Sequence, residues 1–249
     1  TGLIITTSMT PENGVEYTSM SHDPFKSADA FLVQTKKLAD KVHAYDTKIF
    51  ISIGVGFGRN MFPDMMAPAM NNTPVAPSAI PNRWNPSLMC RETTAEELQR
   101  ISESLIKAAS IAKQSGADGI ILDGIYGGYF MDQYATRIFN SRKDEYGYGQ
   151  NGQLKILLDA IKGAKTACGE NFPICTRVTP KHYMKAVGQS ALPGEDFEEA
   201  GRDIDESIEL AKQIADAGAD AILIGDGSYD SFYWLYPPMY QKDGLWLED

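Results

Sequence analysis

The chain has 249 residues, of which 43% are hydrophobic and 22% charged, and this composition excludes disordered and fibrous classes. Its 33 acidic and 23 basic side chains give a formal net charge of -10, and no Lys or Arg cluster could neutralise a run of phosphates, so no nucleic-acid partner is expected. No apolar run reaches the roughly 18 residues that span a bilayer, and no secretion signal precedes the first strand, which favours a cytoplasmic protein without membrane contact. The three cysteines form no CxxC pair and the three histidines share no ligand spacing, so neither a disulfide framework nor a metal site is expected.

Short β-branched runs alternate with helical patterns along the whole chain. In chain order, the pattern predicts a strand at 2–7, a helix at 27–45, a strand at 48–53, a helix at 94–115, a strand at 119–122, a helix at 151–167, a strand at 173–178, a helix at 203–217 and a strand at 221–224. Thr93 or Thr94, placed before Glu96 and Glu97, is a candidate capping box, and Gly116 is the expected stop of the same helix. The phrase Gly-Ala-Asp recurs at 116–118 and 218–220, each time just before a strand.

Strands buried on both faces and joined by helices predict an α/β fold with a parallel sheet. Each strand-helix unit takes about 55 residues, against roughly 31 in a compact eight-fold barrel, so we expect a (β/α)8 TIM-barrel type seen in part. Residues 1–249 are expected to form one partial barrel domain with a long loop at 54–92, at the edge where parallel folds bind ligands. The alternative is an open, doubly wound sheet of five strands.

Candidate site residues follow the third and fourth predicted strands. Tyr126 and Tyr129 lie among three glycines after the third strand, where a phenol can donate a proton and its ring can stack on a flat substrate. The alternative is that both tyrosines pack beneath the loop. Arg177 lies inside the fourth strand and therefore needs either a carboxylate partner, such as Asp123, or an anionic ligand.

Residues 115–147 resemble the central signature of the old yellow enzyme family, most closely its bacterial enoate and 2,4-dienoyl-CoA reductase branch. The matching segments are Gly116-Ala-Asp-Gly119, Gly128-Tyr-Phe-Met-Asp-Gln-Tyr134 and Asn140-Ser-Arg-Lys-Asp-Glu-Tyr-Gly147. Further matches lie at 2–6, 75–80, 91–94, 172–177 and 237–240, so the resemblance covers nearly the whole chain. It implies that the chain runs from the second to the sixth strand of the barrel.

The resemblance implies an FMN at the carboxyl face of the barrel, reduced by NAD(P)H and passing hydride to the activated double bond of a small-molecule substrate. Tyr129 matches the proton-donating tyrosine of the family, and Arg177 matches the arginine beside the flavin. Ser52 stands where the family has a glutamine that holds the flavin pyrimidine ring. Asp123 and Tyr126 stand where a histidine pair, or histidine with asparagine, binds the substrate carbonyl. The resemblance leaves open a homo-oligomer and additional redox modules outside this sequence.

The departures at Asp123 and Tyr126 keep three hypotheses open. The first is an ene-reductase acting on an unsaturated carbonyl-type substrate, although an ionised Asp123 would repel an enolate oxygen. The second is a family member in which Asp123 and Tyr126 recognise a cationic or hydroxylated group. The third is a non-catalytic subunit that keeps the barrel and binds flavin weakly or not at all.

Overall fold

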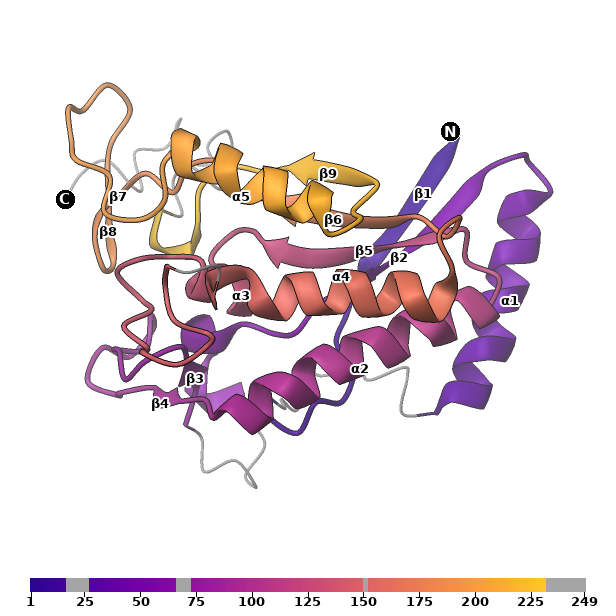
Figure 1. The fold of residues 1–249 in the computed structure, drawn as a ribbon, viewed down its shortest axis with the longest axis horizontal. Coiled ribbons are helices and arrows are strands. Elements are labelled where there is room, and N and C mark those ends of the chain that lie inside the picture. The colour runs from indigo at the N-terminus through magenta and orange to yellow at the C-terminus, as the bar shows by residue number, and fades with distance from the viewer. Residues whose placement is uncertain (17–26, 66–72, 150–151, 232–249) are drawn as a thin grey trace.

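The computed structural model describes residues 1–16, 27–65, 73–149 and 152–231. One parallel sheet runs through it in the order β1 (Leu3–Met9), β2 (Lys48–Ile53), β5 (Gly119–Ile125), β6 (Ile174–Val178) and β9 (Ala221–Ile224). The connecting helices are α1 (Ala28–His43), α2 (Ala95–Gln114), α4 (Lys155–Cys168) and α5 (Ile204–Asp216), and the last three lie side by side over one face of the sheet (Figure 1). The five predicted strands and four predicted helices are therefore confirmed. The matched segment at 237–240 lies outside the described residues.

The order of the strands decides between the two predicted topologies. Each strand of the main sheet pairs in parallel with the strand that follows it along that sheet, without the reversal that defines a doubly wound fold. Sequential parallel strands with their helices on one face are the topology of a (β/α)8 barrel. The doubly wound alternative is therefore wrong, and the described chain forms part of such a barrel.

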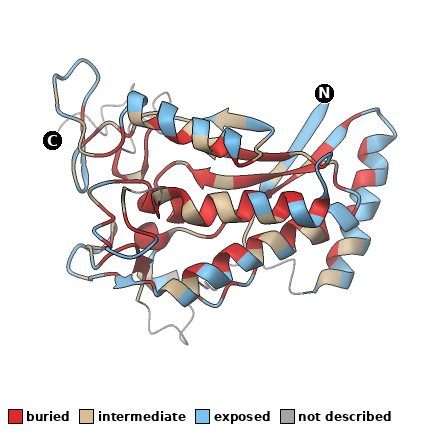
Figure 2. Cartoon of the chain, in the orientation of Figure 1, coloured by how far each residue is buried: buried red, intermediate tan, exposed pale blue. Residues whose placement is uncertain are grey.

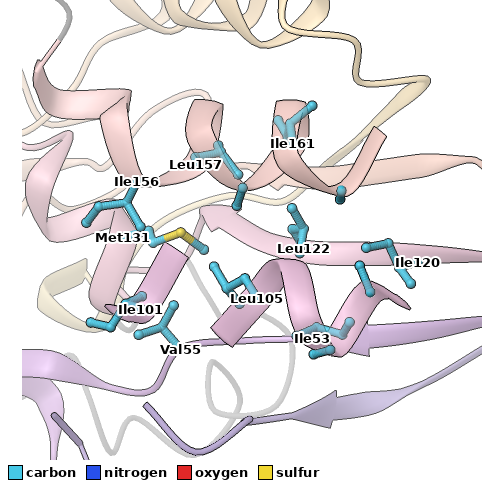
Figure 3. Close-up of a cluster of buried hydrophobic side chains, with 14 of the residues drawn as sticks. Ile53, Val55, Ile101, Leu105, Ile120, Leu122, Met131, Ile156, Leu157 and Ile161 are labelled. Atoms are coloured by element: carbon cyan, nitrogen blue, oxygen red, sulfur yellow. The ribbon is translucent and has the colours of Figure 1, made fainter. Parts of the chain in front are cut away.

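The core lies between the sheet and the facing sides of α2 and α4. Figure 3 shows Leu105 of α2 and Leu157 of α4 directed towards Leu122 of β5, and all three are at most 1% exposed. The outward sides of these helices are exposed, as Figure 2 shows. Helix α2 begins with the predicted capping box, in which Thr94 Oγ1 accepts from Glu97 N at 3.2 Å and Glu97 Oε2 accepts from Thr94 N at 2.8 Å.

The repeated Gly-Ala-Asp phrase joins neighbouring strands at their amino ends. Asp118 N donates to Ile49 O at 2.9 Å while Asp118 Oδ2 accepts from Ile49 N at 2.9 Å. Asp220 forms the same pair of bonds with Ile174, at 2.9 and 2.7 Å. The preceding glycines, at 116 and 218, have φ of 86° and 103°, a conformation that disfavours other residues. The phrase therefore sets where β5 begins beside β2 and where β9 begins beside β6.

Several smaller elements at the carboxyl edge were not predicted. They are the pair β3 (Val75–Ala76) and β4 (Arg91–Glu92), the helix α3 (Phe130–Tyr134), the hairpin β7 (Met184–Ala186) and β8 (Gln189–Ser190), and the 3₁₀ turns Gly58–Asn60, Pro63–Met65, Gly152–Leu154 and Tyr229–Ser231. They are too short for periodicity to reveal. None of the helices in the described ranges is both long and apolar enough to cross a membrane.

Candidate functional site

A cavity of about 370 Å³ opens at the carboxyl ends of β1, β2, β5 and β6 and at the start of α3. Three of the predicted site residues, Asp123, Tyr129 and Arg177, line it. The remaining lining residues are Thr7, Ser8, Thr10, Gly54, Val55, Gly56, Phe57, Phe130 and Met131. Ser52 and Tyr126 are not among the lining residues and contact the cavity wall from behind. Three of the five candidate residues from the sequence therefore line one cavity at the carboxyl edge of the sheet.

Asp123 is the centre of a polar row that crosses four strands. Ser8 Oγ donates to Asp123 Oδ2, and Ser52 Oγ donates to Asp123 Oδ1 at 3.4 Å. A Cβ at Gly54 would lie 2.7 Å from Ser8 Oγ and 2.8 Å from Asp123 Oδ2, so the glycine directly after β2 leaves room for the side chains of Ser8 and Asp123 to meet across that strand. Burial raises the pKa of Asp123, while Ser8, Arg177 and Ser52 act in the opposite direction.

Arg177 both pairs with Asp123 and faces the cavity. Its Nη1 lies 3.4 Å from Asp123 Oδ1, and its Cζ lies 5.6 Å from the centre of the Tyr126 ring. The side chain is 26% exposed, and its guanidinium makes no hydrogen bond to the described residues. The carboxylate partner expected from the sequence is therefore present, and the guanidinium also lines the cavity.

Tyr129 is fixed by the turn that precedes it. Gly127 and Gly128 have φ of 64° and 79°, and Tyr129 N donates to Tyr126 O at 3.1 Å, so the chain reverses sharply and places Tyr129 at the start of α3. Its ring lies 5.4 Å from the ring of Phe57 and 5.4 Å from that of Tyr229. This packing holds the phenol at the cavity wall within an aromatic group.

Tyr126 supports that wall rather than lining it. Its ring stacks 6.0 Å from the Tyr129 ring at an interplanar angle of 24°. On its other side it lies over Gly225, where a Cβ would approach Tyr126 Cε2 to 2.1 Å. The packing alternative from the sequence therefore describes Tyr126 well, whereas Tyr129 reaches the cavity.

A buried ionic group beneath α3 was missed by sequence reasoning. Asp132 Oδ1 lies 2.8 Å from Arg202 Nη1, and Asp132 Oδ2 lies 3.1 Å from His182 Nε2 and accepts from Gly128 N at 2.7 Å. All three side chains are at most 1% exposed. Although burial acts to raise the pKa of Asp132, Arg202 and His182 hold it well below its usual range. The ionised carboxylate thereby anchors the peptide that leads into Tyr129.

Glu16 is a second residue that the sequence gave no reason to single out. It is 5% exposed, and its Oε1 accepts from Gly58 N at 2.8 Å. Its Oε2 has no hydrogen-bond partner in the described part of the chain and lies where a Cβ of Gly56 would be, 1.6 Å from that position. Burial raises the pKa of Glu16 to about 8. Glu16 therefore lies against Gly56, which lines the cavity.

A partial parallel barrel with a polar and aromatic cavity at its carboxyl edge defines the class of ligand-binding (β/α)8 proteins. Within that class, residues 1–226 match the NADH:flavin oxidoreductase / NADH oxidase family. The chain belongs to this family, which is the old yellow enzyme family. Its members are enzymes that bind FMN and use NAD(P)H as reductant.

Individual relatives agree with this assignment. The chain is 40% identical over 249 residues to "Cinnamate reductase" of Clostridium sporogenes, covering 99% of this chain and 37% of that protein. It is 30% identical over 216 residues to "NADH oxidase" of Thermoanaerobacter brockii, covering 87% of this chain and 30% of that protein. The chain therefore spans about a third of the length of these relatives.

Solved structures support the fold. A 2-naphthoyl-CoA reductase complex superposes with a TM-score of 0.71 at 20% identity, covering 92% of this chain and 33% of that one. An old yellow enzyme homologue from Zymomonas mobilis gives a TM-score of 0.68 at 20% identity, covering 91% of this chain and 60% of that one. At these identities the likeness establishes the barrel fold.

Proposed function

We propose that this chain forms the flavin- and substrate-binding part of an FMN-dependent ene-reductase that uses NAD(P)H to reduce an unsaturated carbonyl-type substrate. The observation that carries the proposal is Arg177, whose guanidinium lines the cavity and makes no hydrogen bond to the described residues. A cation kept at a strand end with unused donors favours a ligand that carries negative charge. The family membership supports FMN as that ligand.

The lining residues fit a flat, oxygen-rich cofactor. Gly54 and Gly56 present backbone without side chains, and Gly56 has a φ of 144° that other residues rarely adopt. Arg177 would hold the N1 and O2 edge of the flavin, where reduction accumulates negative charge. Bound there, FMN would supply hydride transfer. Ser52, which is fully buried, would act on the cofactor only through Asp123.

Tyr129 is the proposed proton donor. A phenol can deliver its proton to the carbon opposite the hydride. Asp123 and Tyr126 are the proposed determinants of substrate orientation. The carboxylate of Asp123 disfavours an enolate oxygen beside it, so the substrate carbonyl would lie away from Asp123, and Tyr126 holds the Tyr129 ring.

The aromatic side chains around Tyr129 favour an aryl-substituted substrate. Phe57 lines the cavity, and the rings of Phe57, Tyr129 and Tyr229 lie within 6.4 Å of one another. Offset and edge-on ring packing of this kind extends readily to a further aromatic ring. The relative named "Cinnamate reductase", which matches 99% of this chain, supports the same substrate class.

A non-catalytic subunit is the second candidate, because Asp123 lies 3.4 Å from Arg177 and offsets its charge. The open cavity beside this ion pair favours ligand binding instead. The visible absorbance of the purified full-length protein, and FMN released from it on heating, separate the two candidates. If flavin is present, NADH should bleach it, and enoates and enones should restore the oxidised spectrum. A colourless protein that takes up no added FMN would support the non-catalytic subunit.

A further inference from the structure

The polar row of Ser8, Asp123 and Arg177 gives the cavity a donor and an acceptor at adjacent positions. The three residues come from β1, β5 and β6, and all three line the cavity. Their spacing is set by backbone features, since Gly54, directly after β2, leaves room for Ser8 to reach Asp123. Ser52 holds the other carboxylate oxygen from below at 3.4 Å. The carboxylate is therefore fixed from two sides before any ligand enters.

We infer that this row recognises the imide edge of the flavin, with the Asp123 carboxylate accepting the hydrogen bond from the flavin N3–H. An imide edge presents a carbonyl oxygen, an N–H and a second carbonyl oxygen in sequence. Arg177, with donors that no described residue uses, matches the first carbonyl, and Asp123 beside it matches the N–H. This inference rests on the proposed function, because it assumes that FMN occupies the cavity.

The same arrangement accounts for the position of Ser52. Ser52 is 0% exposed and does not line the cavity, so its short side chain cannot meet a ligand directly. Its hydroxyl instead supports Asp123, which extends from the next strand into the cavity. The acceptor for the N3–H would therefore come from β5, and β2 would contribute only its support.

Flavin analogues test the inference without measuring turnover. The full-length protein, stripped of flavin, is titrated with FMN and with 3-methyl-FMN, which lacks the N3–H, and binding is followed by quenching of flavin fluorescence. A hydrogen bond to a charged group predicts that FMN binds about 10- to 100-fold more tightly than the methylated analogue. Asp123→Ala should weaken FMN and bring the two flavins within about threefold of each other.

A spectroscopic measurement separates the hydrogen bond from a steric effect of the methyl group. FMN labelled with ¹⁵N at N3 should show a slowly exchanging N3–H proton resonance in the wild-type complex, and this resonance should be lost in Asp123→Ala. Asp226→Asn is the matched control, because Asp226 is exposed at the end of β9 and does not line the cavity. It should keep both the discrimination between flavins and the resonance.

The outcomes distinguish this inference from the proposed function. A protein that binds FMN but binds 3-methyl-FMN equally well, or that keeps the protected N3–H in Asp123→Ala, overturns the role of Asp123 and leaves the ene-reductase proposal standing. A protein that binds neither flavin overturns both.

Discussion

Tyr129 and Phe57 show how single residues at this site depend on groups far away in the chain. The peptide before Tyr129 is held by Asp132, and Phe57 lies in a wall backed by Glu16. Phe130 N donates to Gly56 O at 3.1 Å and so joins the two segments. The proposed proton donor is therefore positioned by one local contact, from Asp132 to Gly128, and by one long-range contact, from Glu16 to Gly58.

The role of Tyr129 can be separated into its two half-reactions. Tyr129→Phe should slow substrate reduction by roughly 10² to 10⁴ and leave flavin reduction by NAD(P)H nearly intact, because only the first step needs the phenolic proton. Stopped-flow absorbance measures both rates. Tyr183→Phe, which removes a hydroxyl that bonds to Asp226 at 3.2 Å outside the cavity, is the control. Equal losses in both half-reactions would show that Tyr129 shapes the site and donates nothing.

The buried Glu16 should make the stability of the folded protein fall as pH rises from about 4.5 to about 8. Its pKa is raised from 4.5 to about 8, so the folded state keeps a proton that the unfolded state releases as pH rises through this range. The free energy of unfolding should therefore fall by at most about 1.4 kcal/mol for each pH unit between those values. Glu16→Gln, which is always neutral, should remove this part of the pH dependence in urea unfolding. A variant with the wild-type slope would contradict the assignment.

At the level of elements, the Gly-Ala-Asp phrase connects β5 to β2 and β9 to β6. Asp118 accepts from Ile49 N and also lies 2.7 Å from His43 Nε2 and 3.1 Å from Lys48 Nζ. Asp220 repeats the pattern with Ile174 N and with Lys165 Nζ at 2.7 Å. The repeated phrase thus has the same structural role in both places: its aspartate bonds to the backbone of the neighbouring strand at the amino end of the pair.

Removing one of these carboxylates should destabilise the sheet. Asp118→Ala leaves the Ile49 N–H without its acceptor and is expected to cost about 1 to 3 kcal/mol in the free energy of unfolding, measured with urea. Asp118→Asn keeps an acceptor and should lose less. Asp40→Ala is the control, since Asp40 is exposed and pairs only with Lys36 among the described residues, so its loss should stay within about 0.5 kcal/mol. A large loss for Asp40→Ala would show a general charge effect.

At the scale of the whole molecule, β1 and β9 are the two edges of the described sheet. Ile4 of β1 is 41% exposed and Ile224 of β9 is 70% exposed. Both edge strands of the described sheet therefore expose apolar side chains. Such an edge pairs readily with another strand, as the remaining strands of a closed barrel do.

These edges predict how residues 1–249 behave when produced alone. They should self-associate with rising concentration, and Ile4→Lys combined with Ile224→Lys should lower the average mass measured by light scattering. Val33→Lys replaces a residue that is 53% exposed on α1 and should leave association unchanged. If the edge substitutions have no effect while association persists, the contact lies elsewhere on the surface.

The local pattern of the sequence was sufficient for the elements and for part of the site. Periodicity located the main strands and helices because burial on one face repeats every few residues. Asp123, Tyr129 and Arg177 could be placed together because carboxyl ends of parallel strands share one edge. Ser8 could have been added by the same rule, since it lies near the end of β1. Glu16 and Arg202 could not, because no local pattern marks a buried charge in a loop.

What the sequence determined by itself was the alternation of strands and helices, the stops and caps, and the family signature around Tyr129. What only the tertiary structure decided was how charges are shared. From the sequence, Arg177 was equally compatible with an ion pair and with a ligand, and the structure shows that it pairs with Asp123 and also lines the cavity. Asp132, Arg202 and His182 meet only in the folded chain. The physical reason is that hydrophobic periodicity is a local property, whereas the partner of a buried charge depends on which distant segments the fold brings within a few ångströms.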